Sequence, residues 1–118
     1  MKLLLDTNTC IAYLNGRPSS VADRMKLVAP SDVALSSIVK TELLFGAHKS
    51  AKTVENLARL HVFFSAFRSL PFDDGAADVA AQVRASLERV GTPIGPNDLL
   101  IGAIALAHGL TLVTANTG

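Results

Sequence analysis

The chain has 118 residues, enough for one domain with a single hydrophobic core and too few for two such domains. Hydrophobic residues make up 49% of the sequence and charged residues 18%, which excludes an intrinsically disordered chain. The net charge of +1 gives no overall basic signature, so a nucleic-acid partner has to be attracted by a local patch. The single cysteine, Cys10, excludes an intramolecular disulfide and a multi-cysteine zinc site.

The apolar segments are too short for export or membrane insertion. The N-terminal run Leu3-Leu4-Leu5 is ended by Asp6 too early for a signal peptide. The later apolar stretch over residues 99–110 is too short to span a bilayer. We therefore expect a cytoplasmic protein. Its high apolar content predicts that part of the surface is covered in a homodimer or by another partner.

The first third of the chain alternates between apolar runs and helix-like segments. Residues 2–5 are predicted to form a buried strand, followed by a helix over residues 6–14 that stops at Asn15-Gly16. A second helix, capped by Ser19 or Ser20, is expected to run to about residue 28.

The middle of the chain repeats the pattern. Residues 33–35 are predicted to form a second strand, after which Ser37 caps a helix that carries Glu42. Residues 70–72 are weakly predicted to form a third strand, whose proline favours an edge or strand-end position. Between them lies an apolar stripe at helical spacing, formed by Leu57, Leu60, Phe64 and Phe67.

The last third of the chain contains the most apolar helix. Asp73 or Asp74 is expected to cap a long helix, and residues 91–96 form a loop. Residues 97–108 are apolar on nearly every side and predict a central buried helix, followed by a strand over residues 110–113. The stripe of the long helix consists of Ala76, Val79, Ala80, Val83, Leu87 and Val90.

Three lone acidic residues interrupt strongly apolar segments of the sequence. They are Asp6 after Leu3-Leu4-Leu5, Glu42 within residues 38–46 and Asp98 before Leu99-Leu100-Ile101. Burying a carboxylate costs several kcal/mol unless a partner compensates its charge. Three such residues from distant parts of the chain therefore predict a shared divalent cation, Mg²⁺ or Mn²⁺, which carboxylate oxygens favour.

The predicted topology brings these residues toward one end of a sheet. Strands that alternate with helices indicate a parallel sheet covered on both faces. Ligands of such sheets bind beyond the carboxyl ends of the strands. Asp6 and Asn116 directly follow strands, Glu42 lies on a helix just after a strand, and Asp98 lies in the first turn of a helix. We expect these four residues to converge.

Three of the four candidates also have a simpler interpretation. Asp6 and Asp98 are suited to helix capping, and Asn116 is suited to a turn. Glu42 resists such an interpretation because it shares a helix face with Ile38 and Phe45 and does not face Lys40, two residues away.

Other polar residues carry weaker signals. Cys10 lies between apolar neighbours, as a buried thiol does, and the three histidines lack metal-ligand spacing. The candidate cations for binding a nucleic acid are Arg17, Lys40, Lys49 and Lys52.

Four segments carry a family resemblance and keep their order along nearly the whole chain. They are Leu-Leu-Asp-Thr-Asn at residues 4–8, Ser-Ser-Ile-Val-Lys-Thr-Glu-Leu-Leu-Phe-Gly-Ala at 36–47, Gly-Thr-Pro-Ile-Gly-Pro-Asn-Asp-Leu-Leu-Ile at 91–101 and Leu-Val-Thr-Ala-Asn-Thr at 112–117. With these segments the chain resembles the PIN-domain ribonucleases, specifically the VapC-type toxins of bacterial toxin–antitoxin pairs. Each segment is a weak signal alone, but the ordered set is specific.

The resemblance implies a Rossmann-like three-layer α/β/α domain with Mg²⁺- or Mn²⁺-dependent endoribonuclease activity, directed at structured RNA such as tRNA. It also implies a homodimer that is neutralised by a VapB-like antitoxin, reaches DNA only through that antitoxin and has no membrane partner. Carried over by position, Asp6, Glu42 and Asp98 are the metal-binding and catalytic residues, with Asn116 a weaker fourth ligand. Family members usually continue with another acidic residue and a short strand. We therefore expect residues 1–118 to be a single PIN domain without that segment.

Two other functions stay open from the sequence. The Asp6-Thr7-Asn8-Thr9 segment resembles the Asp-x-Asp-x-Thr loop of haloacid-dehalogenase-like phosphatases, although Asn8 replaces the second Asp. A trapped aspartyl-phosphate would support that class. The other alternative is a binding module that keeps the fold, the dimer surface and the antitoxin groove without turning over RNA.

Overall fold

The computed structural model describes residues 2–16, 23, 25 and 27–114. The elements alternate between strands and helices, as the sequence predicts. The predicted helix that ends near residue 28 lies mostly outside the described residues. In chain order the elements are β1 (Leu3–Leu5), α1 (Thr7–Leu14), the 3₁₀ turn η1 (Pro30–Asp32), β2 (Val33–Ser36), α3 (Ser37–Lys49), α4 (Thr53–Ser65), β3 (Arg68–Leu70), α5 (Asp74–Arg89), α6 (Pro96–His108) and β4 (Thr111–Val113).

The four strands form one parallel sheet in the order β3-β2-β1-β4. Leu4 of β1 pairs with Ala34 of β2 on one side and with Leu112 of β4 on the other. The two inner strands are almost wholly buried, which explains why they read as unbroken apolar runs instead of alternating ones. The predicted parallel sheet is confirmed, and β3 takes the predicted edge position.

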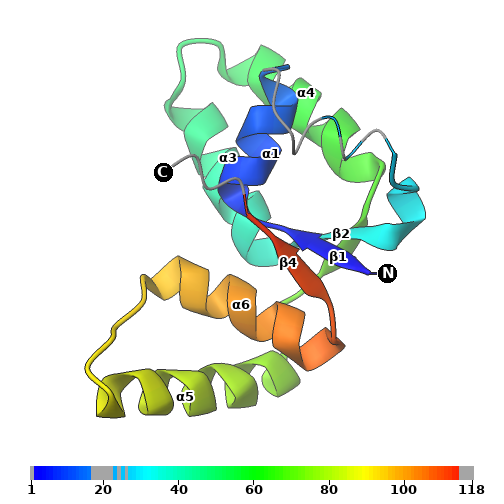
Figure 1. The fold of residues 1–118 in the computed structure, drawn as a ribbon. Coiled ribbons are helices and arrows are strands. Elements are labelled where there is room, and N and C mark those ends of the chain that lie inside the picture. The colour runs from blue at the N-terminus through cyan, green and yellow to red at the C-terminus, as the bar shows by residue number, and fades with distance from the viewer. Residues whose placement is uncertain (1, 17–22, 24, 26, 115–118) are drawn as a thin grey trace.

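Helices cover both faces of the sheet, which gives the predicted three-layer arrangement. Figure 1 shows α1, α3 and α4 gathered on one side of the sheet and α5 paired with α6 on the other. The core is continuous through the layers, because buried side chains of the inner strands pack with Val39 and Leu43 of α3 and with Ile101 and Ile104 of α6. The predicted fold class is therefore confirmed.

Three helices on this scaffold begin with a side-chain cap. Asp6, Ser36 and Asp73 each accept a hydrogen bond from the backbone N–H three residues later, at 2.8–3.1 Å. The predicted cap at Ser37 is wrong by one residue, because Ser36 is the last residue with extended backbone, at φ −81° and ψ 156°. Ser37 lies inside the helix, and its Oγ accepts a hydrogen bond from the Phe72 N–H at 3.2 Å.

A few packing predictions differ from the structure. The third strand covers residues 68–70 and precedes Pro71, which lacks the N–H that would continue the pairing. Val90, which belongs to the predicted core stripe, is 71% exposed because it lies just past the end of α5. The predicted central helix α6 is buried only in its middle. Leu106 near its end is 64% exposed, and most residues of its first turn are also exposed. None of the helices in the described part of the chain is long and apolar enough to cross a membrane.

Candidate functional site

Asp6 lies where the order of strand connections reverses. The chain passes from β1 outward to β2 and β3, then returns to place β4 on the other side of β1. The Asp6 N–H donates to the Val113 carbonyl oxygen at 3.1 Å, and Thr9 Oγ1 donates to the same oxygen at 3.0 Å. These bonds fix Asp6 between the carboxyl ends of β1 and β4. In open α/β sheets this switch point is the usual ligand site.

Only one oxygen of the Asp6 carboxylate takes part in a structural hydrogen bond among the described residues. Its Oδ1 accepts the capping hydrogen bond from the Thr9 N–H at 2.8 Å. Among the described residues, Oδ2 accepts no hydrogen bond, and neither oxygen lies within ion-pair distance of a Lys or Arg. The side chain is half-buried, not enclosed in the core as its apolar neighbours predict. One anionic oxygen therefore stays available for a ligand.

Thr7, the next residue, supplies an orphaned polar atom. Its Oγ1 is buried yet has no hydrogen-bond partner among the described residues. A buried hydroxyl without a partner costs about 1–3 kcal/mol, so such groups usually await a water, an ion or a substrate. The orphaned hydroxyl beside the half-used carboxylate of Asp6 is consistent with a site for a hydrated cation.

Glu42 faces a groove between helices instead of the core. The side chain is half-buried, and its neighbours Phe45 and Gly46 on the same face are exposed, so the predicted burial of this face is wrong. The groove has a volume of about 380 Å³ and lies between α1, α3 and α4. As its spacing predicts, Lys40 does not pair with Glu42. The Lys40 Nζ instead lies 5.1 Å from the centre of the Phe64 ring.

Asp98 is the third residue of α6, and its side chain is exposed. The prediction that it is embedded in the core is wrong, because the buried part of α6 begins only at Ile101. Its carboxylate folds back over the start of the helix. A Cβ at Gly95 would lie 3.5 Å from Asp98 Oδ2.

The three carboxylates come from three layers of the molecule. Asp6 lies at the carboxyl end of the inner strand β1, while Glu42 and Asp98 come from the helical layers on opposite faces of the sheet. Within the described ranges, no three side chains of His, Cys, Asp or Glu lie close enough together to hold a metal ion. Asn116, the fourth candidate, lies outside the described residues. The convergence of these residues on one ion therefore stays a prediction.

Cys10, on the same helix as the Asp6 cap, is fully buried, as predicted. Burial raises the pKa of its thiol from 9.0 to about 12, and the negative charge of Asp6 adds to this effect. The thiol is therefore protonated at neutral pH and is not a nucleophile.

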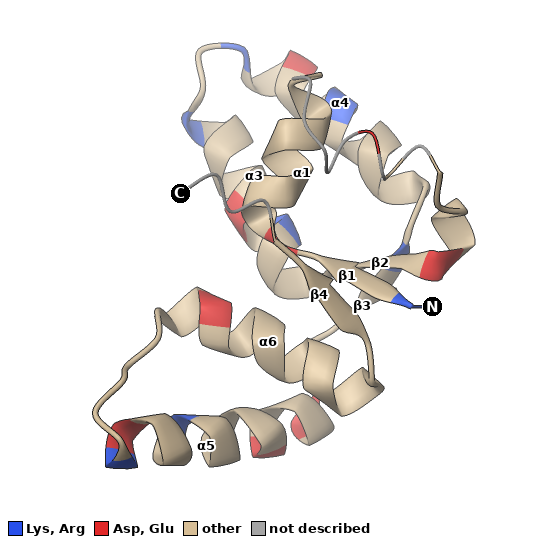
Figure 2. Cartoon of the chain, in the orientation of Figure 1, with Lys and Arg blue, Asp and Glu red and all other residues tan. Residues whose placement is uncertain are grey.

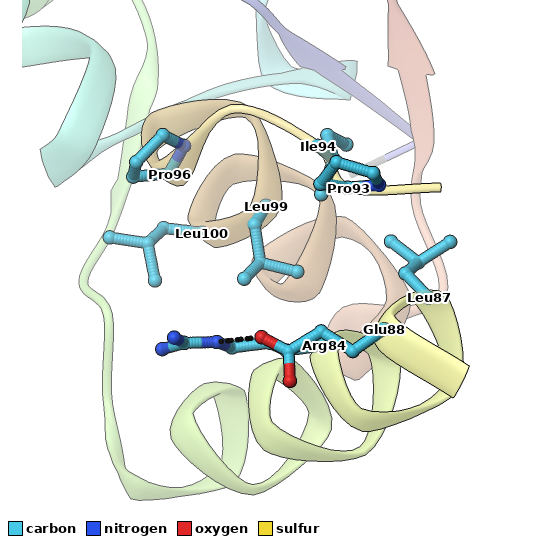
Figure 3. A pocket seen from close by; sticks show the side chains of 8 residues that line it. All are labelled: Arg84, Leu87, Glu88, Pro93, Ile94, Pro96, Leu99 and Leu100. Carbon is cyan, nitrogen blue, oxygen red and sulfur yellow. Dashed lines mark hydrogen bonds and ion pairs between the residues drawn. The ribbon is translucent and has the colours of Figure 1, made fainter. Parts of the chain in front are cut away.

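A second hollow, of about 350 Å³, lies between the end of α5 and the start of α6. Figure 3 shows Leu99 and Leu100 of α6 pointing toward Arg84 and Glu88 of α5. Arg84 Nε donates to Glu88 Oε1 at 3.2 Å, so the two charges compensate each other. The rest of the lining is largely apolar. This hollow therefore lacks the free anionic oxygens that Asp6 and Glu42 offer.

Comparison with known proteins assigns the architecture to a family. Residues 3–118 match the PIN domain family. The chain belongs to the PIN-domain family. It is 41% identical to the tRNA(fMet)-specific endonuclease VapC of Salmonella typhimurium over 116 residues, which cover 98% of this PIN domain and 87% of the relative. It is 38% identical to ribonuclease VapC2 of Rickettsia felis, with the same coverage of both chains. These relatives place it among the VapC-type PIN domains.

Solved structures show the same fold. The PIN domain superposes on the DNA-bound VapBC structure from Salmonella typhimurium with a TM-score of 0.91 and 41% identity, covering 98% of this chain and 87% of the other. It superposes on the FitAcB structure from Neisseria gonorrhoeae with a TM-score of 0.89 and 33% identity, at 98% and 88% coverage. The predicted resemblance is thereby confirmed.

Sequence reasoning missed one side of the candidate site. Arg59 and Asn56 of α4 line the same groove as Glu42, together with Asn15 at the end of α1. Of the cations that the sequence singled out, Lys40 and Lys49 lie over the rings of Phe64 and Phe45, and Arg17 is outside the described residues. The available sequence signal was that Arg59 directly precedes Leu60, a member of the predicted apolar stripe of this helix.

Proposed function

We propose that this PIN domain is the ribonuclease toxin of a VapBC-type toxin–antitoxin pair, and that it cleaves structured RNA such as tRNA by attack of water on a phosphodiester. The observation that carries the proposal is the half-used carboxylate of Asp6 at the switch point of the parallel sheet. The names of the relatives support it, because the Salmonella protein is a tRNA(fMet)-specific endonuclease and the Rickettsia protein a ribonuclease.

The proposed cofactor is a divalent cation, Mg²⁺ or Mn²⁺, held by Asp6, Glu42 and Asp98 with Asn116 as a weaker ligand. The donor chemistry fits, because hard cations prefer carboxylate and amide oxygens and keep bound waters that the Thr7 hydroxyl can contact. When bound, such a cation activates a water and compensates the negative charge that develops on the phosphate.

Each of the residues proposed for the site has a separate role. Asp6 is held rigidly by its backbone and capping hydrogen bonds, so its free oxygen is directed to a fixed position. Glu42 faces the groove and accepts a hydrogen bond from the attacking water. Thr7 orients the site by hydrogen bonding to the hydration shell. Asp98 adds the third carboxylate from the opposite helical layer.

The proposed partners follow from the complexes of the relatives. The Salmonella neighbour was solved as VapBC bound to DNA. We further propose that this PIN domain forms a homodimer, is neutralised by a VapB-like antitoxin in the cytoplasm and reaches DNA only through that antitoxin.

The test is the substitution Asp6→Asn. Asparagine caps helices as well as aspartate does, so α1 and the fold are retained while the anionic ligand is lost. We expect metal-dependent cleavage of a total tRNA pool to fall by more than about a hundred-fold, since even the loss of outer-shell partners costs about 10–100-fold. Circular dichroism and the melting temperature check that the fold is intact.

The matched control is Asp73→Asn, which makes the same exchange at the cap of α5, far along the chain from the candidate ligands. Cleavage by this variant should equal that of the wild type. Full cleavage by Asp6→Asn would reject the proposed site. A wild-type protein that binds its antitoxin but cleaves no RNA with either cation would instead identify a binding module.

A further inference from the structure

The charges of this PIN domain are segregated between its two helical layers. Residues 37–65, which contain α3 and α4, carry four Lys or Arg residues against two acidic ones. Residues 73–108, which contain α5 and α6, carry five acidic residues against two Arg. Figure 2 shows the basic positions along α3, α4 and their connecting loop, and mainly acidic positions on α5 and α6. The near-neutral total charge hides this asymmetry.

The groove between α1, α3 and α4 lies in the basic layer and adjoins the candidate site through Glu42. Its floor is apolar, with Leu43 and Leu60 buried beneath it. Its volume of about 380 Å³ exceeds that of a nucleobase. A polyanion that enters the site from the α5–α6 side would meet Asp98 and a net negative layer instead.

Polar side chains around the groove match a nucleotide. Arg59 is exposed and makes no ion pair within the described ranges, so its guanidinium is free for a phosphate. Asn56 Nδ2 donates to Ser50 Oγ at 2.9 Å, which fixes the amide and leaves its carbonyl oxygen as an acceptor. The amide of Asn15 adds a further donor and acceptor at the end of α1. Such groups read the edges of unpaired bases.

We propose that this groove is the substrate track: an unpaired stretch of RNA next to the cleaved bond lies between α1, α3 and α4. Arg59 holds a phosphate, the apolar floor receives a base, and Asn56 and Asn15 contact its edge. The assignment rests on the proposed ribonuclease function and names the face from which the RNA reaches it. Glu42 marks the end of the track that joins the site.

A substitution at Gly46 can fill the groove without lowering the stability of the fold. It lies inside α3 on the groove wall, and a Cβ added there meets nothing within 4 Å. Gly46→Leu therefore projects a side chain into open space. The exchange also favours the helix, since glycine has a lower helix propensity than alanine or leucine.

The first experiment measures binding of a fluorescein-labelled single-stranded RNA by anisotropy, in EDTA so that no cleavage occurs. Arg59→Gln should weaken binding several-fold and lower the slope of log K against log salt by about 0.7, the value for one phosphate contact. Arg89→Gln is the matched control, because it removes another exposed arginine, one that forms no ion pair with any described residue, from the acidic α5–α6 layer. Equal effects of the two substitutions would overturn the proposal.

The second experiment uses Gly46→Leu, with Gly46→Ala as its graded control. Gly46→Leu should lose RNA binding while its stability to urea is unchanged or higher, and Gly46→Ala should keep most of the affinity. Loss of antitoxin binding with RNA binding retained would assign the groove to the protein partner and overturn the proposal. If RNA binding follows the prediction but the wild type never cleaves, the groove stands and only the ribonuclease function fails.

Discussion

Cys10 shows how one buried side chain couples the candidate site to the stability of the fold. It lies four residues after Asp6: Asp6 caps α1, and Cys10 lies within that helix and packs into the hydrophobic core. Burial and the Asp6 charge both favour the neutral thiol, which raises its pKa from 9.0 to about 12. The native protein therefore holds this proton over a pH range in which the unfolded chain releases it.

The sign of the resulting pH dependence follows from proton linkage. Between about pH 9 and 12 the unfolded state binds fewer protons at Cys10 than the native state, so the free energy of unfolding falls as pH rises. We expect urea denaturation to show a larger loss of stability between pH 8 and pH 10.5 for the wild type than for Cys10→Ala.

The stability of Cys10→Ala relative to the wild type is compared at each pH. The variant is less stable than the wild type at pH 8, because a buried side chain is lost, but the difference between the two proteins should narrow at high pH. If the free energy of unfolding changed with pH in the same way for both proteins, the Cys10 thiol would have the same pKa in the native and unfolded states, and the prediction would be wrong.

Helix α3 shows how much an element depends on one residue. Its Ser36 cap is fully buried, and its Oγ accepts the Val39 N–H at 3.1 Å. The same helix carries Glu42 and one wall of the groove, so the start of α3 sets the direction of both. We infer that the cap contributes to the geometry of the candidate site as well as to stability.

Ser36→Ala should lower the free energy of unfolding by about 1 kcal/mol, the usual cost of losing a serine cap. Urea denaturation measures this loss. Ser65→Ala is the control, because Ser65 Oγ donates to the Val62 carbonyl near the exposed end of α4, and its removal should change stability by less than about 0.5 kcal/mol. A Ser36→Ala variant as stable as the control would show that another group caps α3.

Most elements were predictable because their signals are local. Capping residues, apolar runs and the left-handed Gly109 at φ 66° define the ends of α1, α5 and α6 from sequence alone. The errors arise where tertiary contacts decide. Ser36 and Ser37 are equal as caps, and only the length of β2 selects Ser36. Val90 fits the stripe of α5 but falls past its last turn.

The candidate site was less predictable for a physical reason. An acidic residue among apolar ones in the sequence predicts a buried side chain. In the structure, however, Asp98 lies at the exposed start of a helix, and Glu42 lies beside an open groove. The buried apolar residues near them in the sequence, Leu43 and Ile101, point to other faces of the same helices. The groove itself joins α1, α3 and α4, so Arg59 and Asn56 become neighbours of Glu42 only after folding.

At the scale of the whole molecule, the proposed ligands bridge all three layers. Asp6 belongs to the sheet, at the carboxyl end of β1, Glu42 to the layer of α1, α3 and α4, and Asp98 to that of α5 and α6. The unfolded chain offers no such arrangement. A cation held by these residues therefore binds the native state in preference and stabilises the whole fold, not one element.

We expect Mn²⁺ at a hundred times its dissociation constant to raise the free energy of unfolding of the wild type by about 2.7 kcal/mol, and EDTA to reverse the gain. Calorimetry over a Mn²⁺ titration measures the rise. Asp6→Asn should lose most of the gain, whereas Asp73→Asn, with the same cap exchange at α5, should keep it. Because the readout is stability, it tests the ligand set independently of RNA cleavage. A gain of equal size in Asp6→Asn would place the cation elsewhere on the protein.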